Sequence, residues 1–136
     1  MELTNVTYEG TTTWAFNFYG GGEVVLTNCN ITGEVTGDYA ASNIWCGDGR
    51  NVTVNGGTYG SIFMNAQYHS EWPGAAANAA SKITVNDGTI NTLTLETELG
   101  ADGYYVSATL TQNGGTITEL VENPQGLDLT GRTKVN

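Results

Sequence analysis

The sequence predicts an all-β solenoid of about five coils, and three observations lead to this fold class. A five-residue motif recurs along the 136-residue chain, with its last residue at positions 8, 31, 59, 90 and 117. Short alternations of apolar residues and threonine precede it, which is typical of strands with one buried face. Glycine, asparagine and threonine are abundant, and they favour turns and exposed strand positions over helices. One strand–turn–strand signal every 23 to 31 residues indicates a single solenoid domain over residues 1–136.

The repeated motif marks the corner between two strands of each coil. Such a corner needs a residue in the left-handed conformation, which glycine and asparagine adopt at low cost. Asparagine side chains stacked on successive coils can also hydrogen-bond to one another in a ladder. Clear copies lie at residues 113–117, 86–90 and 55–59, and less closely matching copies lie at residues 27–31 and 4–8.

Aligning the coils on this motif produces columns of apolar residues that should point inward. The columns are Val24/Val52/Ile83/Leu110, Ile31/Tyr59/Ile90/Ile117 and Ile62/Leu93/Leu120. The same alignment places Phe16 on Ile44 and Phe18 on Cys46, so two separate stretches of the coil stay in register. One coil alone cannot bury its apolar face, so we expect the stacked coils to share one core with almost no α-helix.

Three short strands in a coil of this length resemble the right-handed parallel β-helix. This pectate-lyase-like architecture is common in bacterial surface adhesins and in polysaccharide-processing enzymes. The resemblance covers nearly the whole chain. The Asn-Gly-Gly-Thr-Ile motif that carries it is specific for this architecture but gives almost no information about function. Neither end carries a recognisable cap, so we expect a segment of a longer exported protein or end-to-end self-association.

Charge narrows the classes of partner. The net charge is −10, and the basic side chains are only Arg50, Lys82, Arg132 and Lys134. A nucleic-acid partner needs clustered lysine and arginine, so we expect none. No apolar run reaches the ~18 residues of a membrane span, so no membrane insertion is expected. The acidity fits a secreted or cell-surface protein, and the alternative is that the carboxylates serve solubility alone.

Cys29 and Cys46 are the only cysteines, and their spacing matches no zinc or redox motif. Cys46 aligns with Phe18 and should point inward. A bridge across one coil and two buried free thiols both remain open, and the second is favoured.

The longest insertion, residues 67–81, holds the best candidates for ligand binding. Long loops often carry function, and Tyr68 and Trp72 can stack on a sugar face. His69 and Glu71 can act in principle as base and acid. The alternative is an ordinary surface loop in which Trp72 covers a coil edge. Two further residues, Trp14 and Trp45, should lie on outer faces as a reserve binding site.

The sequence contains no catalytic motif, and we expect no metal site and no cofactor. Arg50, Lys82 and Asp48 lie near one another, as in lyases of the pectate-lyase-like type, but without clustered carboxylates for calcium. A surface salt bridge is the simpler interpretation. The leading hypothesis is a non-catalytic, adhesin-like spacer or display module that contacts neutral glycans or a host or cell-surface component. The alternatives are a polysaccharide lyase or glycoside hydrolase fragment, and an ice- or surface-binding solenoid with a threonine strip.

Overall fold

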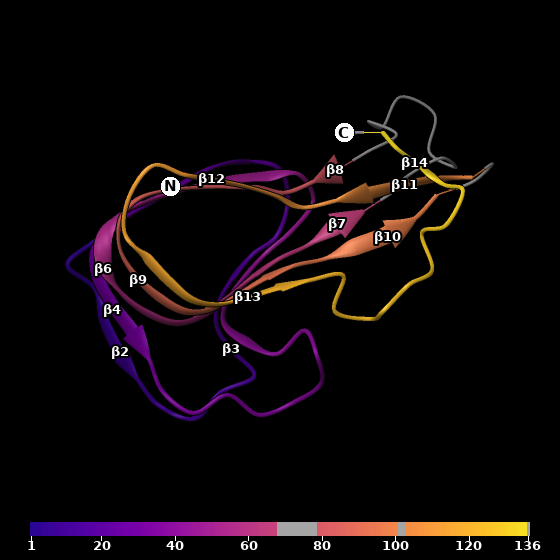
Figure 1. The fold of residues 1–136 in the computed structure, drawn as a ribbon. Helices are drawn as coiled ribbons and strands as arrows, with labels where there is room; N and C mark the ends of the chain where they lie inside the picture. Colours follow the sequence, from indigo (N-terminus) through magenta and orange to yellow (C-terminus); the bar gives the residue numbers. More distant parts are fainter. Residues whose placement is uncertain (68–78, 101–102, 136) are drawn as a thin grey trace.

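The computed structural model describes residues 1–67, 79–100 and 103–135, and every regular element in these ranges is a β-strand. Parallel strands stack into a solenoid of about four turns, which confirms the predicted fold class. Figure 1 looks along the stack, with the rungs superposed on the left. The structure corrects the predicted number of coils from five to about four turns. The motif does occur on five rungs, but after Glu122 the chain leaves the fifth without closing it.

Each rung pairs in parallel with the next along the solenoid. Strands β6 and β9 are long because the chain passes both corners of these rungs without an intervening loop. The rungs are β1 (Glu2–Thr4), β2 (Thr7–Glu9) and β3 (Trp14–Phe18); β4 (Gly22–Thr32) and β5 (Ser42–Cys46); β6 (Arg50–Met64); β9 (Lys82–Leu95); and β12 (Thr109–Gln112) with β13 (Thr116–Glu122).

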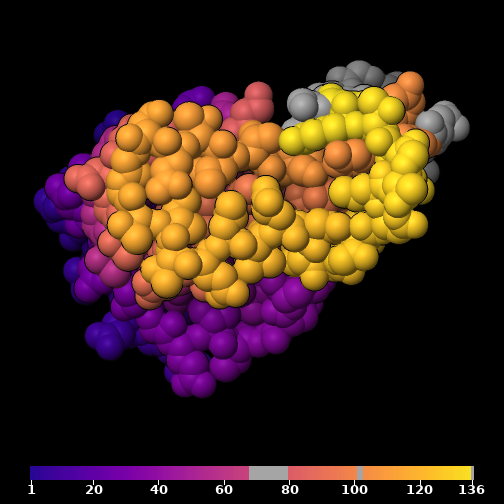
Figure 2. All heavy atoms as spheres, viewed as in Figure 1, coloured from indigo at the N-terminus to yellow at the C-terminus, as the bar shows by residue number. Residues whose placement is uncertain are grey.

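The register of these strands confirms the predicted columns. Val24 pairs with Val52, Val52 with Ile83 and Ile83 with Leu110, and the other two columns align in the same way. Their members on the middle rungs are almost fully buried. Leu120 has the predicted register but is 45 % exposed, because no further rung covers it. Figure 2 shows this last rung, in orange, facing the viewer.

The corners adopt the predicted left-handed conformation, as at Asn28 (φ 49°) and Gly88 (φ 100°). Glycine is also required by space, since a Cβ at Gly57 would lie 2.2 Å from the carbonyl oxygen of Cys29 on the preceding rung. The asparagine ladder forms beside these corners. Asn86 Nδ2 donates to Asn55 Oδ1, and Asn113 Nδ2 donates to Asn86 Oδ1, each at 2.8 Å.

A second, smaller region projects from the solenoid, and the repeat alignment did not predict it. It contains β7 (Ala66–Gln67), β8 (Ala79–Ala80), β10 (Thr97–Leu99), β11 (Tyr104–Ser107) and β14 (Thr133–Lys134). We call this region, together with residues 123–135, the side lobe; Figure 1 shows it on the right. The β7–β8 and β10–β11 pairs are antiparallel, and β14 pairs in parallel with β11. These pairs lie outside the aligned stretches, so the solenoid register is unaffected.

Both cysteines are buried free thiols, which confirms the favoured interpretation. Cys29 Sγ donates to the carbonyl oxygen of Leu3 at 3.3 Å. Burial raises the pKa of the Cys46 thiol to about 12. Because the thiolate is the reactive form, Cys46 should be inert in the folded protein.

Candidate functional site: a polar pocket at the exit corner

The candidate site lies where the chain leaves the solenoid for the side lobe. Asn65, Glu96 and Asn123 follow the last solenoid position of β6, β9 and β13. Their backbone N–H groups donate to Cys46, Met64 and Leu95 at 2.8, 3.0 and 3.2 Å, each on the preceding rung. The three residues therefore form a polar column, which we call the exit corner.

An open pocket of about 410 Å³ lies at the exit corner. Its walls come from both regions of the molecule and from the loop between β4 and β5. It combines one tyrosine with amide, carboxylate and aliphatic groups. The lining residues are Tyr39, Asn65, Ala66, Gln67, Glu96, Thr97, Glu98, Leu99, Gln125 and Leu127.

Glu96 is the buried charged group of this pocket, with 7 % of its surface exposed. Its Oε2 accepts hydrogen bonds from Asn65 Nδ2 and from the Ala66 backbone N–H, the latter at 3.2 Å. Its Oε1 accepts one from the Tyr39 hydroxyl at 3.1 Å. Burial raises the pKa of Glu96, and the nearby Glu98 adds to the rise, while these hydrogen bonds oppose it.

The Tyr39 hydroxyl joins three segments that are distant in the sequence. It donates to Glu96 and accepts a hydrogen bond from Gln125 Nε2 at 2.8 Å. Burial raises the pKa of Tyr39, and the charge of Glu96 raises it further. Because Tyr39 remains 49 % exposed, part of its ring is open to solvent beside the pocket.

One polar atom at the exit corner has no hydrogen-bond partner among the described residues. Asn65 is 8 % exposed, and its Nδ2 is bonded to Glu96, but its Oδ1 is unpaired there. A buried acceptor without a donor is costly. No lysine or arginine lines the pocket, and the charged groups among its described lining residues are the carboxylates of Glu96 and Glu98.

Aromatic rings on the outer face of the solenoid lead to this pocket. Tyr19, Trp45 and Phe63 are stacked, with ring centroids 6.1 and 6.4 Å apart, and we call them the outer aromatic stack. Tyr39 packs against Phe63 at 6.1 Å. Phe63 is paired with Trp45 on the outer face yet is only 1 % exposed, so these rings form a small core outside the solenoid.

The structure places two of the five predicted ligand-binding residues. Trp14 is 44 % exposed, and its indole N–H donates to the carbonyl oxygen of Ala40 at 3.1 Å. Trp45 lies on the outer face as predicted but is half-buried in the outer aromatic stack. Tyr68, His69 and Trp72 lie outside the described residues.

The basic residues singled out in the sequence lie away from the pocket lining. Arg50 pairs with Gly22 and Lys82 with Asn51, so the two are one register position apart on adjacent rungs, as predicted. Arg50 Nη2 donates to the carbonyl oxygen of Tyr19 at 2.8 Å. Among the described residues, no group of three or more histidine, cysteine or acidic side chains is placed to hold a metal ion.

Sequence reasoning missed the residues that form the pocket. Two lining residues, Asn65 and Glu96, do share a signal with Asn123 of the exit corner, because each stands at the same offset after an aligned column and each is polar. Tyr39 and Gln125 have no such signal, since they belong to segments outside the repeat.

Comparisons with family models, with curated proteins and with solved structures found no match. The fold defines the class of protein as a parallel β-solenoid. Fold does not determine function, so the function has to be argued from the pocket.

Proposed function

We propose that this chain is a non-catalytic module of a secreted or cell-surface protein, an adhesin-like spacer or display element that contacts neutral glycans. Among the pectate-lyase-like β-helices that the sequence resembles, the proposed role is a non-enzymatic one. A rigid stack of rungs supports a display role, because each rung is fixed by pairing with its neighbours.

The observation that carries the proposal is the pocket at the exit corner. It sets the exposed part of the Tyr39 ring beside the polar groups of Asn65, Glu96 and Gln125. Sugars present an apolar face and a rim of hydroxyl groups, and such a mixture of one ring and planar hydrogen-bonding side chains suits both. The net charge of −10 disfavours anionic polymers.

A glycan-array screen followed by calorimetry tests the proposal. We expect neutral oligosaccharides to bind with an affinity that changes little with salt, because a neutral sugar forms no ion pairs that salt can screen. Tyr39→Ala should weaken binding by about tenfold or more. Tyr104→Ala is the matched control, because Tyr104 is 41 % exposed but does not line the pocket. Absence of glycan binding at any salt concentration would refute the proposal.

A second arm tests the sequence-based hypothesis for the insertion. If Trp72 and Tyr68 make the contact, Trp72→Ala should abolish binding and leave the melting temperature nearly unchanged. If Trp72 instead covers a coil edge, the melting temperature should fall. Comparison with Tyr39→Ala then shows whether the pocket or the insertion holds the glycan.

One observation favours glycoside hydrolysis as the second candidate function. Glu96 and Glu98 line the same pocket, and burial raises the pKa of Glu96. Glycosidases use two carboxyl groups, and the one that acts as general acid has a raised pKa. Against this, Glu96 already accepts hydrogen bonds from Tyr39, Asn65 and Ala66. Release of reducing ends from a neutral polysaccharide, lost in Glu96→Gln, would establish the hydrolase; binding without release supports the display module.

A further inference from the structure

Two buried side chains at the exit corner, Glu96 and Asn65, have acceptor positions that no described residue fills. A carboxylate offers about four acceptor positions, and three donors from the described part of the chain reach Glu96. The remaining position is on Oε1, the oxygen that faces Tyr39. Asn65 Oδ1 adds a buried acceptor with no donor among the described residues. The missing partner should therefore bring N–H or O–H donors.

The charge of the pocket indicates which kind of donor fits. Among the described residues, Glu96 and Glu98 both line it, and the lysine and arginine side chains, Arg50, Lys82, Arg132 and Lys134, do not. Glu98 contributes to the raised pKa of Glu96, so the charge of Glu98 acts on the Glu96 carboxylate. A buried carboxylate without a counter-ion is costly, and a cation would offset this cost. A neutral hydroxyl would supply a donor but no charge.

We infer that the exit-corner pocket binds a primary ammonium group, and that the glycan recognised there carries an unacetylated amino sugar. The inference rests on the glycan binding proposed above, and it changes the ligand from a neutral glycan to one that carries a charged amine, whose affinity should fall as salt rises. An ammonium group brings three donors and one positive charge on a compact centre. The exposed part of the Tyr39 ring beside Glu96 can contact the sugar ring that carries the amine.

The test compares two ligands that differ only at the nitrogen. A glucosamine oligomer and the corresponding N-acetylglucosamine oligomer are titrated at about pH 6. This pH lies below the pKa of ~8 of an α-amino group, so the amine is protonated. We expect the amine to bind about tenfold or more tightly, because acetylation removes its charge and two of its donors. This ligand comparison needs no variant, so it holds even if a substitution disturbs folding.

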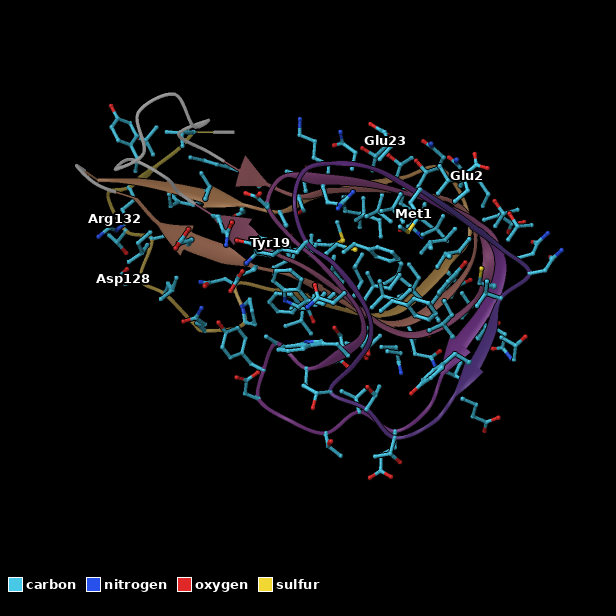
Figure 3. The ribbon with its side chains drawn as sticks, turned by 180° about the vertical axis from the view of Figure 1, so that it is seen from behind. Met1, Glu2, Tyr19, Glu23, Asp128 and Arg132 are labelled. Atoms are coloured by element: carbon cyan, nitrogen blue, oxygen red, sulfur yellow. The ribbon has the colours of Figure 1, made fainter. Side chains whose placement is uncertain are left out.

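Two variants locate the effect. Glu96→Gln keeps the shape of the side chain and removes its charge, so amine affinity should fall by about tenfold or more, and by clearly more than N-acetyl affinity. Glu23→Gln is the control, because Glu23 is an exposed glutamate on β4 that Figure 3 shows away from the side lobe. Glu23→Gln should leave both affinities unchanged, although it removes the same charge from the chain.

Three results would overturn the inference. Equal binding of the two oligomers would refute the ammonium preference and leave the neutral-glycan function standing. Binding of neither would refute both proposals. Amine binding that Glu96→Gln and Glu23→Gln weaken equally would show general attraction to an acidic protein instead of a site.

Discussion

The solenoid and the side lobe differ in the interactions that stabilise each of them. The solenoid buries a continuous core of aliphatic and aromatic side chains, and each strand of its middle rungs pairs on both sides. Among its described residues, the side lobe has a small buried hydrophobic cluster of Ala66, Ala80 and Val106, with Val135 packed against it. The lobe therefore depends on its attachment to the solenoid, and the pocket lies where the two regions meet. The regularly stacked rungs stabilise the molecule, and the segments that leave the stack form the candidate site.

The largest effect should come from the centre of the solenoid. Ile90 is fully buried and stacked between Tyr59 and Ile117. Ile90→Asp places an unpaired charge among apolar neighbours on two rungs, which costs more than about 4 kcal/mol. We expect loss of the β-sheet circular dichroism signal for the whole chain. Retention of a cooperative unfolding transition would show that the solenoid is less unified than its core suggests.

A core substitution in the side lobe should act locally. Val106 is fully buried, and Val106→Ala removes two methyl groups at a cost of about 1–3 kcal/mol. Amide hydrogen exchange should speed up in β10 and β11 and remain slow in β6 and β9. Equal acceleration in all four strands would contradict the division into two regions.

The boundary between the regions should respond to pH. The pKa of Glu96 is raised above its ordinary 4.5, so the folded state holds this proton more tightly than the unfolded chain. The stabilising contribution of the bound proton is complete below pH ~4.5 and is lost as the pH rises through the raised pKa. The size of this loss is about 1.4 kcal/mol for each pH unit that separates the folded and unfolded pKa values.

Glu96→Gln removes this titration. The stability of the variant relative to the wild type should therefore rise between pH 4 and pH 7, measured by urea unfolding at both values. The Glu23→Gln control should show no such trend. A relative stability of Glu96→Gln that falls with pH would mean that the hydrogen bonds to Glu96 outweigh its burial.

The smallest effect should come from the surface of the solenoid. Asn86 joins Asn55 and Asn113 through two exposed hydrogen bonds of 2.8 Å. Exposed hydrogen bonds add little, so Asn86→Ala should cost about 0.5–1 kcal/mol in urea unfolding. A loss above about 2 kcal/mol would show that the ladder, and not only the core, holds the corners in register.

The sequence predicted the solenoid because one physical requirement repeats on every rung. Inward columns must be apolar and corners must be left-handed, so the register of Val52 on Ile83 and of Phe16 on Ile44 followed from spacing alone. The same rule failed for the exposure of Leu120, because spacing does not show that a rung lacks a neighbour.

The pocket could be predicted only in part. The polar column at Asn65 and Glu96 has a constant offset from the motif, but its burial depends on the side lobe. Phe63 alternates outward, and only packing with Tyr39 and Trp45 explains why it is buried. The contact between Tyr39 and Gln125 spans 86 residues without any periodic signal. Trp45 was correctly assigned to an outer face, but its place in a stack depends on Tyr19 and Phe63.

The parallel register also implies an order of assembly. Each rung pairs with a rung 23 to 31 residues away, so every addition closes a chain loop of similar length at a similar entropic cost. A chain that is synthesised from its amino terminus can therefore add each new rung onto the rung formed before it. The hydrogen bond from Gln125 to Tyr39 cannot form until the chain has been synthesised as far as residue 125. We therefore expect the pocket to take shape after the rungs of the solenoid beside it have paired.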